Sequence, residues 1–469
     1  MGLKSNILRI FSANFLTMIS GIIIGFVVPA VLSVDSYAYL KTYTFYLSYI
    51  GLLHFGFIDG MYIKYGGKEL EVLDKREFKL EHIVFIFIQI IITIFFIILA
   101  FYKSDIIVLL LALSILPINT VSFFTLFYQS VGEFKKYANI SYVYTLIYLV
   151  INVLLAIVFK SKSYILYCIA SILANGVVFL YLEYKFFMEF NKIKVKYDRK
   201  VWNNIKVGFF VLLGNLSVVM FYAIDRWFIK LFYTVNDFAY YSFAISMLNI
   251  INVLISAISV TFYNYLAKDE NEKRVKKLKT YFIILGAFAS LGYFVLAGIV
   301  NIILKKYIPS LNIIAISFAA YPYMIVINAL YVNLYKARKD EKKYLRVVLL
   351  MLIISTIYNS IAMIFSKNPI SIAIATTISF ITWYIYSSRD FKYLKSTKKE
   401  IIYLVLNLVM FLVFANIFKW YLGGVLYLIS ISISTLIIFK EESIKEIDFI
   451  FRKKGVKKLK FKKDKGNKI

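Results

Sequence analysis

Apolar residues in this chain occur in blocks of about 20, the length that a helix needs to cross the roughly 30 Å of hydrocarbon in a bilayer. Within lipid, every backbone N–H and C=O must find a partner inside the protein, and these runs lack the alternation of a transmembrane β-strand. Hydrophobic residues make up 61% of the chain and charged residues 17%, which is far from the composition of a soluble domain. The sequence therefore predicts an all-α polytopic membrane protein.

The apolar blocks and the charged breaks between them predict about fourteen transmembrane helices. The expected spans cover residues 7–31, 37–61, 83–102, 106–128, 139–159, 163–184, 207–231, 238–262, 280–304, 312–335, 345–365, 370–388, 401–419 and 421–439. The first block is too long for a signal peptide and lacks a small-residue cleavage site, so it is interpreted as the first span.

Basic residues are concentrated in alternate loops. One loop carries Lys64, Lys68, Lys75, Arg76 and Lys79, whereas the segments on the opposite side carry one or two each. Because positively charged loops remain in the cytoplasm, we expect a bacterial cell-membrane protein with both termini in the cytoplasm. The formal net charge of +29 lies in these loops and in a basic tail, so membrane lipids are the predicted partners of that charge and nucleic acid is not.

The chain contains a weak internal repeat. Residues 34–39 (VDSYAY) align with residues 235–240 (VNDFAY) at an offset of 201, and the same offset pairs Asn14 with Asn215 and Tyr62 with Tyr263. Six spans per repeat is an even number, so both halves would enter the membrane from the same side, as parallel repeats.

The repeat gives a predicted division of the chain. We expect six-helix lobes at 1–190 and 191–395, two additional helices within 396–440, and a basic cytoplasmic tail at 441–469. Transporters with such halves bind substrate between them and rock one half against the other.

One charged pair, Asp225 and Arg226, lies well inside the seventh span. Charges within spans are costly and usually face a cavity or a partner. A guanidinium binds phosphate in a bidentate manner that an ammonium group cannot reproduce. Arg226 is therefore a candidate contact for an anionic substrate, with Asp225 orienting it or pairing with it. The structural alternative is an ion pair that fixes helix packing.

The second span carries three further ionisable residues. Lys41 lies near the predicted outer end, where it could line the same cavity or extend to the lipid headgroups. His54 and Asp59 lie toward the inner end and are candidates for ion or proton coupling. The alternatives are a helix–helix hydrogen bond for His54 and a structural ion pair of Asp59 with Lys64.

The eighth span has a polar face at helical spacing, which could line a cavity or allow close helix packing. Its members are Ser242, Ser246, Asn249, Ser256 and Ser259.

Several classes of site are absent from the sequence. There is no phosphate-loop motif for ATP hydrolysis, and the single cysteine, Cys168, and two histidines, His54 and His82, are too few for a metal cluster. The predicted outer loops are too short for a catalytic domain. We therefore predict a transporter without a metal or cofactor, and not an enzyme.

Three stretches resemble a known family. They are residues 56–68 (GFIDGMYIKYGGK), residues 128–138, which contain YQ and then GEFKKYA, and residues 224–229 (IDRWFI) followed by 240–244 (YYSFA). In this order they are similar to segments of the O-antigen and capsule-type polysaccharide flippases of the multidrug/oligosaccharidyl-lipid/polysaccharide exporter superfamily. One departure is Tyr263-Asn264, where the family pattern has a proline after the tyrosine.

The resemblance implies an alternating-access flippase. Its implied substrate is a polyprenyl-diphosphate-linked oligosaccharide, moved from the inner to the outer leaflet for surface-polysaccharide assembly alongside a glycan polymerase and glycosyltransferases. The candidate substrate contacts are Arg226, Asp225, Lys41 and Lys230. A cation-coupled drug exporter of the same superfamily is the alternative, and the short loops count against a membrane-embedded glycan polymerase or ligase.

Overall fold

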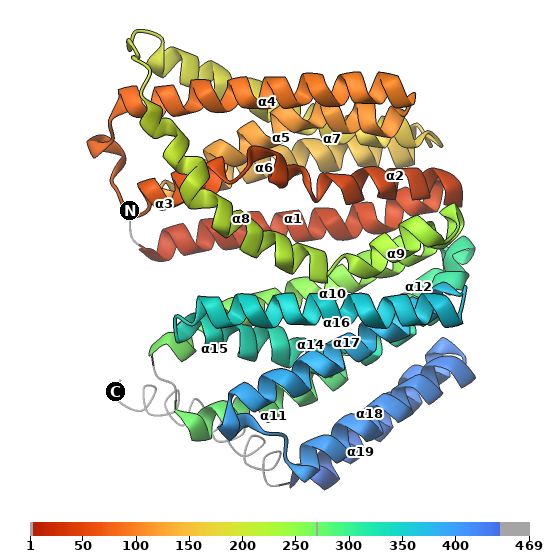
Figure 1. The fold of residues 1–469 in the computed structure, drawn as a ribbon. Helices are drawn as coiled ribbons and strands as arrows, with labels where there is room; N and C mark the ends of the chain where they lie inside the picture. The colour runs from red at the N-terminus through yellow and green to blue at the C-terminus, as the bar shows by residue number, and fades with distance from the viewer. Residues whose placement is uncertain (1–2, 269–270, 441–469) are drawn as a thin grey trace, which may run out of the picture. The chain divides into compact units, whose positions relative to one another are not determined.

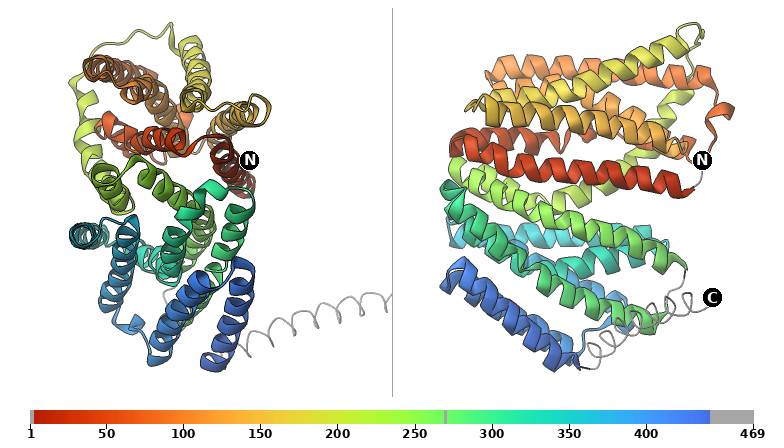
Figure 2. Two further views of the ribbon diagram at one scale, coloured as in Figure 1. Left: turned by 90° about the vertical axis from the view of Figure 1, so that its right-hand side faces the viewer. Right: turned by 180° about the vertical axis from the view of Figure 1, so that it is seen from behind.

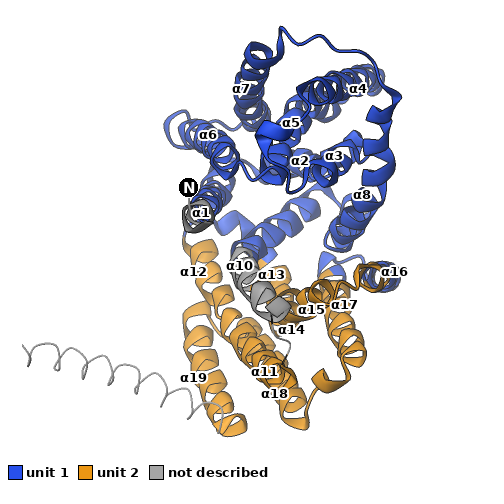
Figure 3. Ribbon diagram, turned by 90° about the vertical axis from the view of Figure 1, so that its left-hand side faces the viewer, with its two compact units in different colours: residues 1–253, 303–310, 348–372 blue, residues 254–302, 311–347, 373–469 orange. Residues whose placement is uncertain are grey.

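The computed structural model describes residues 3–268 and 271–440, and within these it describes the side chains except those of residues 3–8, 253–258 and 260–268. The predicted basic tail at 441–469, the departure at Tyr263-Asn264 and the side chain of Ser256 lie outside what the structure describes. The chain forms two compact units, coloured separately in Figure 3. Unit 1 comprises residues 1–253, 303–310 and 348–372, and unit 2 comprises residues 254–302, 311–347 and 373–469.

Unit 1 contains the helices of the first half of the chain and parts of the second half. From the first half they are α1 (Leu3–Val31), α2 (Val34–Leu47), η1 (Ile50–His54), α3 (Phe57–Tyr65), η2 (Leu70–Val72), α4 (Lys75–Lys103), α5 (Ile106–Ser130), α6 (Phe134–Val153), η3 (Leu154–Val158), α7 (Tyr164–Phe190), η4 (Arg199–Trp202), α8 (Asn203–Phe221) and α9 (Ile224–Phe232). The unit continues with the first part of α10 (Val235–Lys268), η5 (Lys305–Ser310), most of α16 (Glu341–Phe365) and the start of α17 (Pro369–Asp390). Helix α1 packs against α6, and α5 packs against both α4 and α7. Most of these helices run along one another, whereas α8 crosses obliquely (Figures 1 and 2).

Unit 2 contains the helices of the second half. They are the rest of α10, α11 (Glu272–Ala289), α12 (Gly292–Ile302), α13 (Leu311–Ala319), α14 (Tyr321–Val326), η6 (Ile327–Tyr331), α15 (Val332–Ala337), the start of α16 (Glu341–Phe365), most of α17 (Pro369–Asp390), η7 (Lys392–Leu394), α18 (Lys398–Ile417) and α19 (Trp420–Ile438). Helices α11 and α14 pack together, and so do α18 and α19.

The structure confirms an all-helical polytopic membrane protein. Eleven helices in the described part of the chain are long and apolar enough to cross a membrane, or twelve if the bent pair Lys305–Ala319 and Tyr321–Ala337 forms one span. Fourteen crossings remain a prediction. The expectation of unbroken helices at 37–61, 207–231 and 312–335 is wrong, because η1, a break after Phe221 and a 47° bend interrupt them.

The interruption of the second expected span has a local cause. Phe55 and Gly56 both adopt left-handed backbone conformations, with φ of 51° and 84°. Such a pair cannot continue a right-handed helix, so the chain turns between η1 and α3. A hydropathy pattern is insensitive to this backbone change, and the interruption was not predicted.

Helix α3 crosses α8 at very short range. A Cβ atom added to Gly60 would lie 1.9 Å from the carbonyl oxygen of Asn204, and one added to Gly208 would lie 1.9 Å from the carbonyl oxygen of Gly56. Small residues at spacing i, i+4 allow membrane helices to bring their backbones together. Gly56 and Gly60 have this spacing, so the contact depends on the absence of side chains.

Replacing Gly60 with alanine is therefore expected to destabilise the protein by about 3 kcal/mol, because the backbones of α3 and α8 must separate. The matched control is Gly214→Ala, on α8 itself, where an added Cβ meets nothing within 4 Å. Thermal unfolding of the purified variants measures the difference. Equal stability of the two variants would contradict the account of this crossing.

A buried ion pair joins α11 to α18 in unit 2. The Nζ of Lys279 lies 3.0 Å from Oε2 of Glu400, and the residues are only 1% and 4% exposed. Lys279 also donates to the carbonyl oxygen of Leu394 at 2.8 Å, and the Thr280 hydroxyl donates to Glu400 at 3.1 Å. The pair is thus hydrogen-bonded on both sides, as a buried charge requires.

Candidate functional site

The site begins at the break between α8 and α9. Helix α8 ends at Phe221 and α9 starts at Ile224, so Asp225 and Arg226 occupy the first turn of a new helix. The Asp225 carboxylate, 3% exposed, accepts the Arg226 backbone N–H at 2.7 Å and the Tyr241 hydroxyl of α10 at 2.8 Å. An acidic residue is stabilised at a helix N-terminus. Asp225 therefore fixes the helix start from which Arg226 projects.

The Arg226 guanidinium makes no close ion pair among the described residues, although its charge interacts with the neighbouring Asp225 carboxylate. Its carbon Cζ lies 4.9 Å from the centre of the Phe45 ring of α2, and its Nε is buried without a hydrogen-bond partner. The hydrogen bonds of the Asp225 carboxylate go to Tyr241 and to the backbone, so Asp225 orients the helix start, and its pairing with Arg226 remains a prediction. A cation–π contact compensates only part of the cost of burying a charge.

Two lysines accompany Arg226. Lys41 of α2 donates to the Ser246 hydroxyl of α10 at 2.8 Å and lies within range of electrostatic repulsion from Arg226. Lys230, one turn beyond Arg226, donates to the Thr42 hydroxyl at 2.8 Å. Lys41 therefore faces α10, contrary to the alternative in which it extends to the headgroups. We call Lys41, Arg226 and Lys230 the cationic cluster.

Aromatic side chains hold the cationic cluster in place. Trp227 donates from its ring nitrogen to the Tyr49 hydroxyl at 2.7 Å, and its ring centre lies 4.9 Å from that of Phe45. The Lys230 ammonium lies 4.9 Å from the centre of the Phe238 ring. These contacts join α2, α9 and α10 within unit 1, and they restrict the positions that the three cations can adopt.

The side-chain hydrogen bonds of the two lysines go to neutral hydroxyls. Apart from Asp225 beside Arg226, the close neighbours of the three positive groups are neutral or aromatic. An anion would complete this arrangement in a segment predicted to lie inside a membrane. Arg226 has the planar donor geometry that suits a phosphate group, and the lysines add point charges. The cluster can therefore bind a phosphorylated ligand.

His54 and Asp59 lie together at the turn between η1 and α3. His54 Nε2 is 3.9 Å from Asp59 Oδ2, and that oxygen is buried without a hydrogen-bond partner. The Nδ1 atom of His54 accepts the Gly56 backbone N–H at 3.1 Å, so the histidine makes a local bond and not one between helices. No contact joins this pair to the cationic cluster, and its role in coupling remains a prediction.

The expected ion pair of Asp59 with Lys64 is wrong. The two residues are five apart on a helix and so point to different faces. Lys64 instead lies 2.7 Å from Glu77 and pairs with Glu81, which is fully buried. Glu81 also accepts the Tyr65 hydroxyl at 2.7 Å and the side-chain amide of Asn204 at 2.8 Å, a network that joins α3, α4 and α8.

The polar face of α10 is divided between two roles. Ser246 accepts from Lys41 and so belongs to the site, next to the buried Ser242, whereas Asn249 is exposed. Ser259 donates to the Asn328 carbonyl oxygen at 3.0 Å within unit 2, which is a packing contact. Ser259 therefore fits the packing interpretation, and a cavity lined by Ser242 and Ser246 remains a prediction.

Comparison with known proteins identifies the family. A family model described as polysaccharide biosynthesis protein matches residues 3–268, more than half of the chain. The chain belongs to this family. No match was found among curated proteins.

Two solved structures share the fold of this polysaccharide biosynthesis protein. The lipid II flippase MurJ, in an inward closed conformation, aligns with 93% of this chain and 99% of its own, with 15% identity and a TM-score of 0.69. An inward-facing multidrug resistance MATE transporter of the MOP superfamily aligns with 84% of this chain and 99% of its own, with 13% identity and a TM-score of 0.55. The protein therefore shares the fold of these two structures.

Sequence reasoning missed the neutral residues that complete the site of this family member. Tyr241, Trp227 and Thr42 position the charged groups, yet each is one of many aromatic or hydroxyl residues in apolar blocks. Only their contacts distinguish them. Within the described residues, no group of three or more His, Cys, Asp or Glu side chains could hold a metal ion.

Proposed function

We propose that this protein is a flippase that moves a polyprenyl-diphosphate-linked oligosaccharide from the inner to the outer leaflet of the bacterial cell membrane. The observation that carries the proposal is the cationic cluster, in which Nε of Arg226 is buried without a hydrogen-bond partner and the guanidinium contacts the Phe45 ring. A diphosphate supplies the negative charge that the cluster lacks. Membership of the polysaccharide biosynthesis family supports a glycan as the rest of the substrate.

The proposal includes a membrane topology. The interrupted segment α2–α3 and helix α10 would add two crossings to the eleven or twelve candidate spans. With about fourteen crossings, the bias of basic loops places both termini in the cytoplasm. The two six-helix lobes at 1–190 and 191–395 then alternate access to the site, with two peripheral helices at 396–440.

Reconstitution tests the proposal. The full-length protein is placed in phosphatidylcholine vesicles with a polyprenyl-diphosphate oligosaccharide that carries a fluorophore on the glycan. Quenching by external dithionite reports the fraction of labelled lipid in the outer leaflet. We expect the labelled lipid of the inner leaflet to be quenched much faster than in vesicles without the protein. Equal rates in the two vesicle types would reject the flippase.

The alternative function is export of a cationic drug, which the fold shared with the MATE transporter makes worth testing. The cationic cluster argues against it because like charges repel such a substrate. Transport of a cationic dye in the same vesicles, with no movement of the glycolipid, would favour the alternative.

Lys41 provides a separate test of the site. Replacing it with glutamine keeps a hydrogen-bond donor for Ser246 but removes the charge, and we expect about tenfold weaker binding of a short-chain, water-soluble prenyl diphosphate. Lys103→Gln is the matched control, because Lys103 is an exposed lysine at the end of α4. Isothermal titration calorimetry measures both affinities. Equal affinities for the two variants would remove Lys41 from the site.

A further inference from the structure

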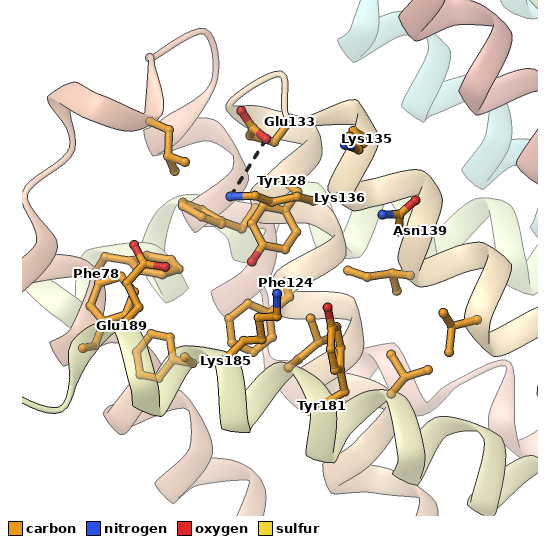
Figure 4. A pocket seen from close by; sticks show the side chains of 18 of the residues that line it. Phe78, Phe124, Tyr128, Glu133, Lys135, Lys136, Asn139, Tyr181, Lys185 and Glu189 are labelled. Carbon is orange, nitrogen blue, oxygen red and sulfur yellow. Dashed lines mark ion pairs between the residues drawn. The ribbon is translucent and has the colours of Figure 1, made fainter.

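A pocket lies within unit 1, and none of the cationic cluster residues line it. It has a volume of about 680 Å³ and is formed by the ends of α4, α5, α6 and α7 that meet the connections before α4 and α6. Figure 4 shows the Lys185 side chain of α7 pointing into this pocket, with Tyr128 and Tyr181 beside it and the Glu133–Lys136 ion pair at its rim.

The lining changes from charged to apolar along the helices. On α6 the lining residues, from the helix start, are Lys135, Lys136, Asn139, Ile140, Tyr142 and Val143. On α7 the lining residues, from the helix end, are Phe190, Glu189, Phe186, Lys185, Leu182, Tyr181, Val178 and Val177. Twelve residues separate Glu189 from Val177, or about 18 Å along the helix. The charged side chains of the lining therefore all lie near the helix ends, among aromatic and apolar ones, and toward the middle of α6 and α7 the lining carries no charge.

The charged end carries an excess of positive charge. Lys75 pairs with Glu189 at 3.6 Å and Lys136 with Glu133 at 3.9 Å, whereas Lys135 and Lys185 have no acidic partner among the described residues. The Lys185 ammonium lies 5.3 Å from the centre of the Tyr181 ring. No side chain caps the start of α6 at Glu133, so the N-terminus of this 20-residue helix also favours an anion.

The apolar end is continuous with the surface that faces lipid. Val143 and Val177 are 41% and 47% exposed, and Tyr181 is 52% exposed. A free inorganic anion would contact only the lysines and would leave this wall uncovered. A phospholipid would occupy both ends, with its headgroup at Lys135 and Lys185 and its acyl chains along Val143 and Val177.

From this arrangement we propose that the pocket binds an anionic phospholipid, such as phosphatidylglycerol, as a lipid held at the protein surface and distinct from the transported substrate. The basic end selects the headgroup charge, and the aromatic and apolar walls hold the glycerol and the chains. The proposal does not depend on the flippase activity. It requires only that these helices cross a membrane.

Native mass spectrometry of the full-length protein tests the proposal. The protein is taken from vesicles with equal amounts of phosphatidylglycerol and phosphatidylcholine that have the same acyl chains. We expect preferential retention of phosphatidylglycerol, reduced on the order of tenfold in the double variant Lys135→Gln/Lys185→Gln. The matched control is Lys194→Gln/Lys196→Gln, which removes two exposed lysines from the nearby connection after α7 and should retain the lipid as the wild type does.

A second variant tests the apolar end with both lysines intact. Val143→Trp places a large side chain where the acyl chains would lie, and retention of phosphatidylglycerol should fall below that of the wild type. Equal retention of the two lipids by the wild type would overturn the proposal, and so would wild-type retention by either test variant. Thermal stabilisation by inorganic phosphate as strong as that by phosphatidylglycerol would also overturn it, because it would indicate a site for a soluble anion.

Discussion

Arg226→Ala is expected to reduce flipping of the diphosphate-linked glycan by about 30- to 150-fold. Hydrogen bonds to a charged group contribute on the order of 2–3 kcal/mol, and each 1.36 kcal/mol corresponds to a factor of ten in rate. Arg226→Lys keeps the charge but loses the bidentate geometry, so an intermediate loss of about tenfold is expected. Initial rates of dithionite quenching in reconstituted vesicles measure both losses.

The hypothesis that Arg226 contacts the diphosphate can be distinguished from a packing role for Arg226. Arg226 makes no close ion pair with Asp225, so removal of the guanidinium should leave membrane abundance near that of the wild type. If the pair were structural, Asp225→Ala and Arg226→Ala would each lower abundance, and the double variant would partly restore it. The control is Arg199→Ala, which removes an exposed arginine at η4. Full transport by a well-expressed Arg226→Ala protein would end the hypothesis.

The largest effect on stability is expected at the buried pair Lys279–Glu400. Lys279→Met leaves the Glu400 carboxylate buried without its counter-ion, which costs about 3–5 kcal/mol. Thermal or denaturant unfolding of the purified protein in detergent measures the loss. The exposed pair in the same unit supplies the control: Lys343 lies 3.3 Å from Asp390 with a side chain that is 42% exposed, and Lys343→Met should cost less than about 1 kcal/mol.

A double variant distinguishes the loss of the ion pair from the loss of packing. Lys279→Met/Glu400→Gln removes both charges, and glutamine can still serve in the capping box that Glu400 forms with Thr397. Most of the stability should therefore return. A double variant as unstable as Lys279→Met alone would show that the charge interaction does not dominate at this position.

The sequence predicted the helices well because hydrophobic length is a local property. The long apolar blocks are mainly helical in the structure, and the one that forms α4 (Lys75–Lys103) is a single helix. It did not predict the breaks, because they arise from backbone conformation at particular residues. Phe55 at a φ of 51° is an example. The spacing of Gly56 and Gly60 could have predicted the close crossing of α3 and α8.

Charged residues of the site were predicted individually, but their partners were not. Arg226 and Lys41 were selected because charges inside spans are costly. Contacts in the structure join residues that are distant in sequence. Lys41 and Ser246 of the site are 205 positions apart, and the packing pair Lys279 and Glu400 is 121 positions apart. The alternative in which Asp59 pairs with Lys64 relied on nearness in sequence, whereas Lys64 pairs with Glu77 and Glu81 of α4.

The central claim is that the cationic cluster recognises the diphosphate of a lipid-linked glycan. The most direct measurement compares flipping rates in the same vesicles for three lipids with identical glycan and prenyl chain, joined by a diphosphate, a monophosphate or a neutral ether. The account predicts that the diphosphate lipid moves fastest, at least tenfold faster than the neutral lipid, and that Arg226→Ala abolishes most of this preference. Equal rates for the diphosphate and the neutral lipid in the wild-type protein would contradict it.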